Sequence, residues 1–301
     1  MKRIICIGEC ALYVVFDGQK PVGAMPGGRI AAAASLMAHD GLPVVMASEA
    51  SSDPVGDMVV KSLTDAGVDV SSLDRFTEGR TPMVIFTQDE DGTPHVTRYE
   101  DYSDEAFDIV WPRVDEDSVV VYGGYYSLDS RMRTRMVPFL NHCAEMGAVM
   151  VYMPGFMSVQ ESRITRVMPA ILENLELADI VVARNADLAN IFGVTAEEKA
   201  YNDHIDFYCR SMISVDPANR YLSYYSGKEV TQIRIPELIC ETMTWNAGVV
   251  AGVAGEIYAQ GITKDQLNAP DAPLREKLLS AAALSAQQAA KGLTEEWQKR
   301  V

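Results

Sequence analysis

Short apolar runs alternate with longer segments of helical spacing along most of the chain. The runs at 4–7, 44–47, 119–122, 149–152 and 180–183 are typical of strands buried on both faces. The segments predicted as helices lie at 30–38, 55–66, 131–145, 163–174 and 186–192. This alternation predicts an α/β fold with a mainly parallel sheet, right-handed crossovers and helices on both faces.

Two β-rich hairpins interrupt the alternation. One is built around 11–16 and closes at Asp17-Gly18, and the other joins 82–87 to 95–99 through the polar segment 89–92. We expect the segments at about 11–24 and 82–102 to form a small lid sheet apart from the main layer. The whole chain, residues 1–301, is then predicted to be a single domain that carries this lid.

The C-terminal third holds a polar turn that leads into Ala-rich helical segments. Helices are expected at 249–259, 274–284 and 285–291, the last two in contact or continuous, with Gly261 and Gly292 as stops. The turn before them, 241–248, has the outline of a helix N-terminus that binds an anion. Its residues do not suit that task, because no glycine precedes Asn246 and the large ring of Trp245 occupies the space an anion needs.

Charge and cysteine content exclude several classes of partner. The net charge of −16 argues against nucleic acid or an anionic membrane surface, but not against a small-molecule ligand. No apolar run reaches the roughly 18 residues needed to span a bilayer. The five cysteines are scattered and form no CxxC pair, and no histidine pair has metal-ligand spacing, so we expect a cytoplasmic protein with buried thiols and no structural metal.

Several short motifs follow one another in the order and spacing that a known protein family shows. They are Ile7-Gly8-Glu9, Pro26-Gly27-Gly28, the stretches 51–56 and 63–69, Arg80-Thr81-Pro82 and 89–92. Together they resemble the ribokinase-like (PfkB) family of carbohydrate and nucleoside kinases. The resemblance implies an αβα sandwich with a small β lid, and ATP and Mg²⁺ as cofactors if kinase activity is retained. On its own, the Gly27-Gly28 pair also fits a plain tight turn.

The positions that carry chemistry in this family differ here. Where the family has Gly-Ala-Gly-Asp, whose Asp is the general base and whose amides form an anion hole, this chain has the residues 244–247, so Ala247 stands in the place of the base. Tyr13 replaces an Asp that grips the sugar, and Ala32 replaces an Asn. The Asn-x-x-Glu motif becomes Arg184 to Asp187, or Asn185 to Leu188 if the alignment is shifted by one.

We interpret these differences as a retained fold with a changed site, in which ordinary sugar phosphorylation is impaired. Such a site is either natural, as in a pseudokinase, or rebuilt by engineering into a more apolar pocket. The resemblance assigns the pocket to Tyr13, Gly27, Gly28, Ala32, Arg98, Tyr125, Met153 and Trp245. It assigns the catalytic corner to Asn246, Ala247 and Asp187, and the phosphate positions to Arg184, Thr244 and Gly248.

Two alternatives stay open. An active kinase would take its base from Asp187, Glu241 or Glu9 and steady the phosphate with Arg184 or Arg29. Asp187 also fits a helix first-turn carboxylate, and Glu241 also fits a solvated hairpin end. A rebuilt hydrolytic site would use Cys10, Tyr13 or His95, although no Ser/His/Asp or Cys/His spacing supports it. The exposed lid further predicts a lid-to-lid homodimer.

Overall fold

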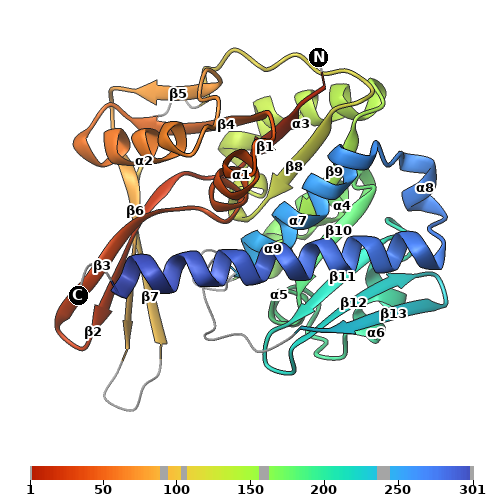
Figure 1. Cartoon of the computed structure of the whole chain (residues 1–301). Coiled ribbons are helices and arrows are strands. Elements are labelled where there is room, and N and C mark those ends of the chain that lie inside the picture. The colour runs from red at the N-terminus through yellow and green to blue at the C-terminus, as the bar shows by residue number, and fades with distance from the viewer. Residues whose placement is uncertain (1, 89–93, 103–106, 156–162, 236–244, 299–301) are drawn as a thin grey trace.

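A nine-stranded sheet forms the centre of the computed structural model, which describes residues 2–88, 94–102, 107–155, 163–235 and 245–298 (Figure 1). Its strand order is β13-β12-β11-β10-β9-β8-β1-β4-β5. The strands are β1 (Ile4–Ile7), β4 (Val44–Ser51), β5 (Leu73–Phe76), β8 (Val119–Gly123), β9 (Val149–Met153), β10 (Ile180–Arg184), β11 (Met212–Asp216), β12 (Tyr221–Ser226) and β13 (Glu229–Arg234). All neighbours from β5 to β11 pair in parallel, and β12 and β13 form an antiparallel edge.

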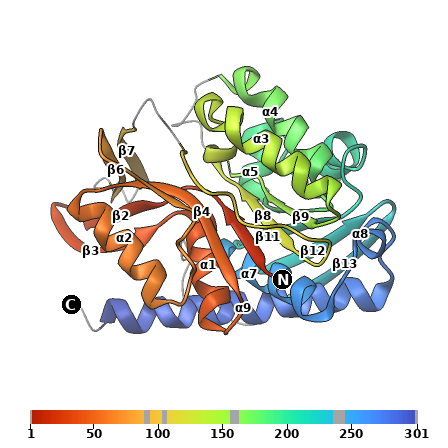
Figure 2. The same cartoon turned by 90° about the horizontal axis from the view of Figure 1, so that it is seen from above.

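Successive side chains of the strands enter two separate hydrophobic cores. Ile4 and Cys6 of β1 belong to one core, and Ile5 and Ile7 belong to the other, because side chains of a strand alternate between the faces of a sheet. Helices cover both faces (Figure 2), so the expected αβα sandwich is confirmed.

Two groups of helices form the outer layers. The first face carries α1 (Arg29–His39), α7 (Trp245–Gln260) and α9 (Ala272–Gln298), with α2 (Pro54–Asp65) beside α1. The opposite face carries α3 (Ser130–Glu145), α4 (Ile164–Leu177), α5 (Asn185–Phe192) and α6 (Glu197–Ala200), followed by a π-helical turn at Tyr201–Ile205. The short α8 (Lys264–Asn268) leads into α9. No helix in the described ranges is both long and apolar enough to cross a membrane.

A separate four-stranded sheet projects from one end of the sandwich as a lid (Figure 1). Its strands are β2 (Ala11–Asp17), β3 (Lys20–Gly27), β6 (Arg80–Gln88) and β7 (Pro94–Asp101), in the order β3-β2-β6-β7. Two antiparallel hairpins are joined by parallel pairing of β2 with β6. Tyr13 lies opposite Met25 and Val84, and Val84 lies opposite Arg98, so these four side chains share one face of the lid.

Asp53 connects the lid to the sandwich. Its carboxylate caps α2 by accepting a hydrogen bond from the Gly56 N–H at 2.7 Å. The same carboxylate accepts bonds from the N–H and the hydroxyl of Thr81 on β6, both at 2.9 Å. One side chain therefore fixes the start of a helix and the entry of a lid strand at once.

Helix α9 is longer than its sequence predicts. The pattern predicts a stop at Gly292, but the helix continues to Gln298. A glycine inside a helix costs only about 1 kcal/mol relative to alanine, which is less than packing of a long helix contributes. The prediction of a stop at Gly292 is therefore wrong, whereas the end of α7 before Gly261 agrees with the structure.

Glycines let α7 and α9 pack closely. A Cβ on Gly252 would lie 2.4 Å from the carbonyl oxygen of Ala281, and one on Gly248 would lie 2.7 Å from Cα of Ala286. Gly248 thus faces α9, and the structure gives it a packing role where the family resemblance implies a phosphate contact.

The packing of α7 on α9 predicts different outcomes for two matched substitutions. Gly252→Ala and Gly255→Ala gain the same helix propensity, but a Cβ at Gly255 meets only the end of the Leu42 side chain, at 3.2 Å. We expect Gly252→Ala to lower the free energy of unfolding relative to Gly255→Ala by about 1–3 kcal/mol, because it overpacks backbone against backbone. Urea denaturation measures both variants, and equal stabilities would contradict this contact.

Candidate active site

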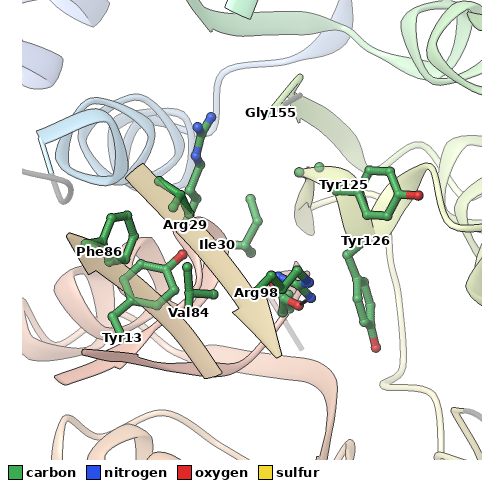
Figure 3. A pocket seen from close by; sticks show the side chains of 13 residues that line it. Tyr13, Arg29, Ile30, Val84, Phe86, Arg98, Tyr125, Tyr126 and Gly155 are labelled. Atoms are coloured by element: carbon green, nitrogen blue, oxygen red, sulfur yellow. Dashed lines mark hydrogen bonds and ion pairs between the residues drawn. The ribbon is translucent and has the colours of Figure 1, made fainter. Parts of the chain in front are cut away.

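A cavity lies between the inner face of the lid and the carboxyl ends of β1, β8 and β9, where parallel sheets place their ligands (Figure 3). Its volume is about 60 Å³. The lining comprises Glu9, Tyr13, Arg29, Ile30, Val84, Phe86, Val96, Arg98, Gly123, Gly124, Tyr125, Tyr126 and Gly155. Aromatic rings of the lid face Tyr125 and Tyr126 across this space, so Tyr13, Arg98 and Tyr125 lie where the sequence places a pocket.

Tyr13 fills much of the space beneath the lid. Its ring packs edge-on against Phe86, with the ring centroids 5.2 Å apart, and lies directly over Gly27. A Cβ on Gly27 would come within 2.3 Å of that ring, so Tyr13 requires glycine at this position. Burial raises the pKa of Tyr13 against the opposing effect of Arg29, so the phenol stays protonated at neutral pH and is no candidate nucleophile.

Glu9 is held by two groups from the lid. Arg98 donates to both of its carboxylate oxygens, at 2.9 Å from Nη1 and with a second contact from Nη2, and the Tyr102 hydroxyl donates at 2.8 Å. The Arg131 guanidinium stacks on the Tyr102 ring at 4.2 Å and donates to Glu49 at 2.8 Å. This chain of contacts joins β7, β1, α3 and β4 around the cavity.

Asp187 is shared by two arginines. Arg184 donates to both of its oxygens, at 2.7 and 2.8 Å, and Nη1 of Arg29 lies 3.2 Å from each of them. The carboxylate is fully buried, and burial alone would raise its pKa. Arg29 and Arg184 outweigh that effect and hold the pKa of Asp187 below its ordinary value, so it is a poor proton acceptor.

The residues at the start of α7 are in the core. Met153, Trp245 and Ala247 all belong to the hydrophobic core on the α7 side, and Ala247 is 1% exposed. Asn246 is buried too, and its Nδ2 donates to the Met153 sulfur at 3.4 Å. We expected a pocket between Tyr13, Met153 and Trp245, and the structure corrects this. Met153 and Trp245 are packed into the core, where burial of their apolar surface stabilises them.

The remaining candidate site residues do not lie together in one site. Gly27 and Ala32 line a second cavity on the far side of Tyr13, and a Cβ on Gly28 (φ 111°) would lie 2.0 Å from the Glu9 carbonyl oxygen. Gly28 therefore allows a close approach to the protein's own backbone. Thr244 and Glu241 lie outside the described residues.

The groups named for a hydrolytic site do not form one. Cys10 is buried, and burial raises the pKa of its thiol to about 12, whereas His95 is exposed on β7. Cys6, Cys143 and Cys209 are also buried free thiols, and Cys240 lies outside the described residues. The alternative that depends on Cys10, Tyr13 or His95 thus has no activated nucleophile among the side chains that the structure describes.

Sequence reasoning missed the Glu49–Arg131 pair. Glu49 is almost fully buried in β4, and burial raises its pKa even though Arg131 opposes that rise. A charged residue inside an apolar strand was the available signal, because such a group must find a partner in the fold.

Comparison with known proteins agrees with this architecture. The profile of the pfkB family of carbohydrate kinases matches residues 1–205. No curated protein matches the sequence. Aminoimidazole riboside kinase from Salmonella enterica, in complex with aminoimidazole riboside and an ATP analog, has a TM-score of 0.80 at 17% identity and covers 96% of this chain and 93% of its own.

Two further solved structures have the same fold. Fructokinase from Vibrio cholerae O395 has a TM-score of 0.79 at 18% identity, with 98% of this chain and 99% of that chain covered. A PfkB protein from Polaromonas sp. JS666 has a TM-score of 0.72 at 15% identity, with 97% of each chain covered. From the family match over two thirds of its length and from this fold, the chain belongs to the pfkB family of carbohydrate kinases.

Proposed function

We propose that this protein is a PfkB-type small-molecule binder in which transfer of phosphate from ATP to a sugar or nucleoside hydroxyl is strongly impaired. The observation that carries the proposal is Ala247, a buried methyl group at the position of the family's general base. General-base catalysis contributes typically about 10²–10⁴-fold to rate, and a methyl group cannot supply it. The substrate class comes from similar proteins that are named as kinases of aminoimidazole riboside and fructose.

Nearby carboxylates do not replace the missing base in this conformation. Both oxygens of Asp187 are occupied by Arg184 and Arg29, and both oxygens of Glu9 are occupied by Arg98 and Tyr102. The same occupancy leaves these two carboxylates poorly suited to bind Mg²⁺. The small volume of the cavity also argues against an active kinase site in this conformation, because ligand pockets usually measure about 300–1,000 Å³.

One local feature still favours an anionic group on the ligand. Two guanidinium groups, Arg29 and Arg184, share the single carboxylate of Asp187, which leaves one positive charge in excess among these described residues. Arg29 also lines the cavity, so a phosphate or carboxylate of the ligand would complement this charge.

An active kinase that uses Glu9 as its base is the second candidate. Glu9 is the one carboxylate among the described residues that line the cavity. Movement of the lid would carry Arg98 and Tyr102 away from Glu9 and free its oxygens.

Release of ADP over a panel of sugars and nucleosides, with ATP and with or without Mg²⁺, tests the proposal. We expect negligible turnover for the wild type. We expect Ala247→Asp to exceed the matched Ala247→Asn variant by about 10²-fold, because only the carboxylate accepts a proton. Circular dichroism checks that both variants fold.

If the wild type turns over and Glu9→Gln abolishes that turnover, the proposal of impaired phosphoryl transfer would be overturned. The result would favour an active kinase that uses Glu9 as its base. Turnover that survives Glu9→Gln would contradict both. Equal inactivity of the two Ala247 variants would mean that more than the base is missing from the site.

Asp187 is expected to act as a counter-ion for two arginines. Asp187→Asn leaves Arg29 and Arg184 partly buried without a negative partner, so we expect a loss of about 3–5 kcal/mol in the free energy of unfolding at pH 7. The lowered pKa of Asp187 means that its contribution is present above its ordinary value of 3.8 and is lost as pH falls further, toward the folded-state pKa. The gap between wild type and variant should therefore narrow only below about pH 4.

Urea denaturation from pH 7 to pH 3 measures this gap. The control is Asp108→Asn, because Asp108 forms an exposed ion pair with Arg135. This substitution should change the free energy of unfolding little. A gap for Asp187→Asn as small as that of the control would contradict the counter-ion role.

A lid-to-lid homodimer is also part of the proposal. In the described residues β3 and β7 are the unpaired edges of the lid, and Tyr99 on β7 is exposed. We expect light scattering to give twice the 33.0 kDa monomer mass, and substitution of Tyr99 by Lys to reduce it toward the monomer. A wild type that stays monomeric at high concentration would contradict this assembly.

A further inference from the structure

A second cavity lies on the other side of α1 from the candidate active site. Its volume is about 620 Å³, roughly ten times that of the first cavity. Its walls come from α1, α2, the end of β3 and the segment 285–289 of α9, elements that are labelled in Figure 1. Its apolar lining includes Ala32 and Leu36 of α1 and Val59 and Leu63 of α2.

The inner face of the lid extends over both cavities. Met25 lines the second cavity and lies directly opposite Tyr13, which lines the first. Gly27 also borders the second cavity, and the Tyr13 ring rests on it. Tyr13 and Gly27 therefore lie between the two cavities at the end of the second cavity that reaches the lid.

The two cavities differ in chemistry as well as in size. Arg29, Arg98 and Glu9 line the first, whereas neither arginine nor lysine is among the described residues that line the second. The charged group at the end of the second cavity is Asp40, beside His39, which disfavours an anion. Hydroxyl groups of Ser35 and Ser62 provide polar points in its walls.

We infer that the second cavity is a binding site for an uncharged, largely apolar small molecule. Its volume lies within the range of about 300–1,000 Å³ that is typical of ligand pockets, and its lining has the usual composition of apolar walls with a few hydrogen-bonding groups. A bound ligand would remove part of these apolar walls from water, which stabilises the complex. ATP and sugar phosphates fit this lining poorly, because no arginine or lysine among its described residues offsets their charge.

This site does not depend on whether phosphoryl transfer survives. Binding in the second cavity and ADP release are separate measurements, so either proposal can fail without the other.

Titration with N-phenyl-1-naphthylamine, an uncharged apolar fluorophore, tests the site in the full-length protein. We expect saturable binding of one probe per chain. Ala32→Phe and Ser62→Phe project a ring into the cavity from α1 and from α2, and each should weaken binding at least tenfold. Val96→Phe fills the first cavity instead and should leave binding unchanged, which makes it the matched control.

The position of Tyr13 between the two cavities has its own test. Tyr13→Ala joins the two cavities, so Val96→Phe should weaken probe binding in the Tyr13→Ala background although it has no effect in the wild type. This coupling is a readout that a merely structural role of Tyr13 would not produce.

Three outcomes would overturn the inference. They are absence of saturable binding to the wild type, binding that persists unchanged in both Ala32→Phe and Ser62→Phe, and loss of binding in Val96→Phe alone. Because the two filling substitutions come from different walls, failure of one variant to fold leaves the other to decide. A probe site that vanishes when the protein is diluted to monomers would assign this surface to a second copy of the chain and would equally overturn it.

Discussion

The buried carboxylate of Asp187 is the interaction on which the arrangement of this end of the molecule depends. It lies in the first turn of α5, yet it fixes Arg184 at the end of β10 and Arg29 at the start of α1. A charge taken out of water must be compensated, and here the compensation comes from the end of a central strand and from a helix on the opposite face of the sheet. The entrance of α1, and with it the glycine turn beneath the lid, is thereby held in place across the carboxyl edge of the sheet.

The fold followed from periodicity because the central strands β1, β4, β8, β9 and β10 are buried on both faces, whereas helices such as α2 and α4 are buried on one. Those patterns are local, so they can be read without knowing the tertiary structure. The exceptions have local causes too. In β5 the buried Leu73 and Phe76 enclose two charged residues, which hid the strand, and α9 passes through Gly292 because a 27-residue helix outweighs one unfavourable residue.

The candidate site was only partly predictable, because the sequence specifies which residues changed but not where the new side chains go. Tyr13, Arg98 and Tyr125 line the cavity beneath the lid, and their assignment to a substrate pocket stays a prediction. Met153 and Trp245 lie in the core, where burial of their apolar side chains stabilises the fold. Pairings such as Glu49 with Arg131, 82 residues apart, follow from tertiary structure alone.

The contact of Tyr13 with Gly27 constrains how this sequence can change over time. With the ring in place, any side chain at position 27 collides with it, so position 27 is closed to mutation while Tyr13 remains. Loss of the ring would reopen position 27, and a side chain acquired there would then bar the tyrosine from returning. Substitutions at positions 13 and 27 are therefore coupled, and the order in which they occur decides which of them the lid can accept.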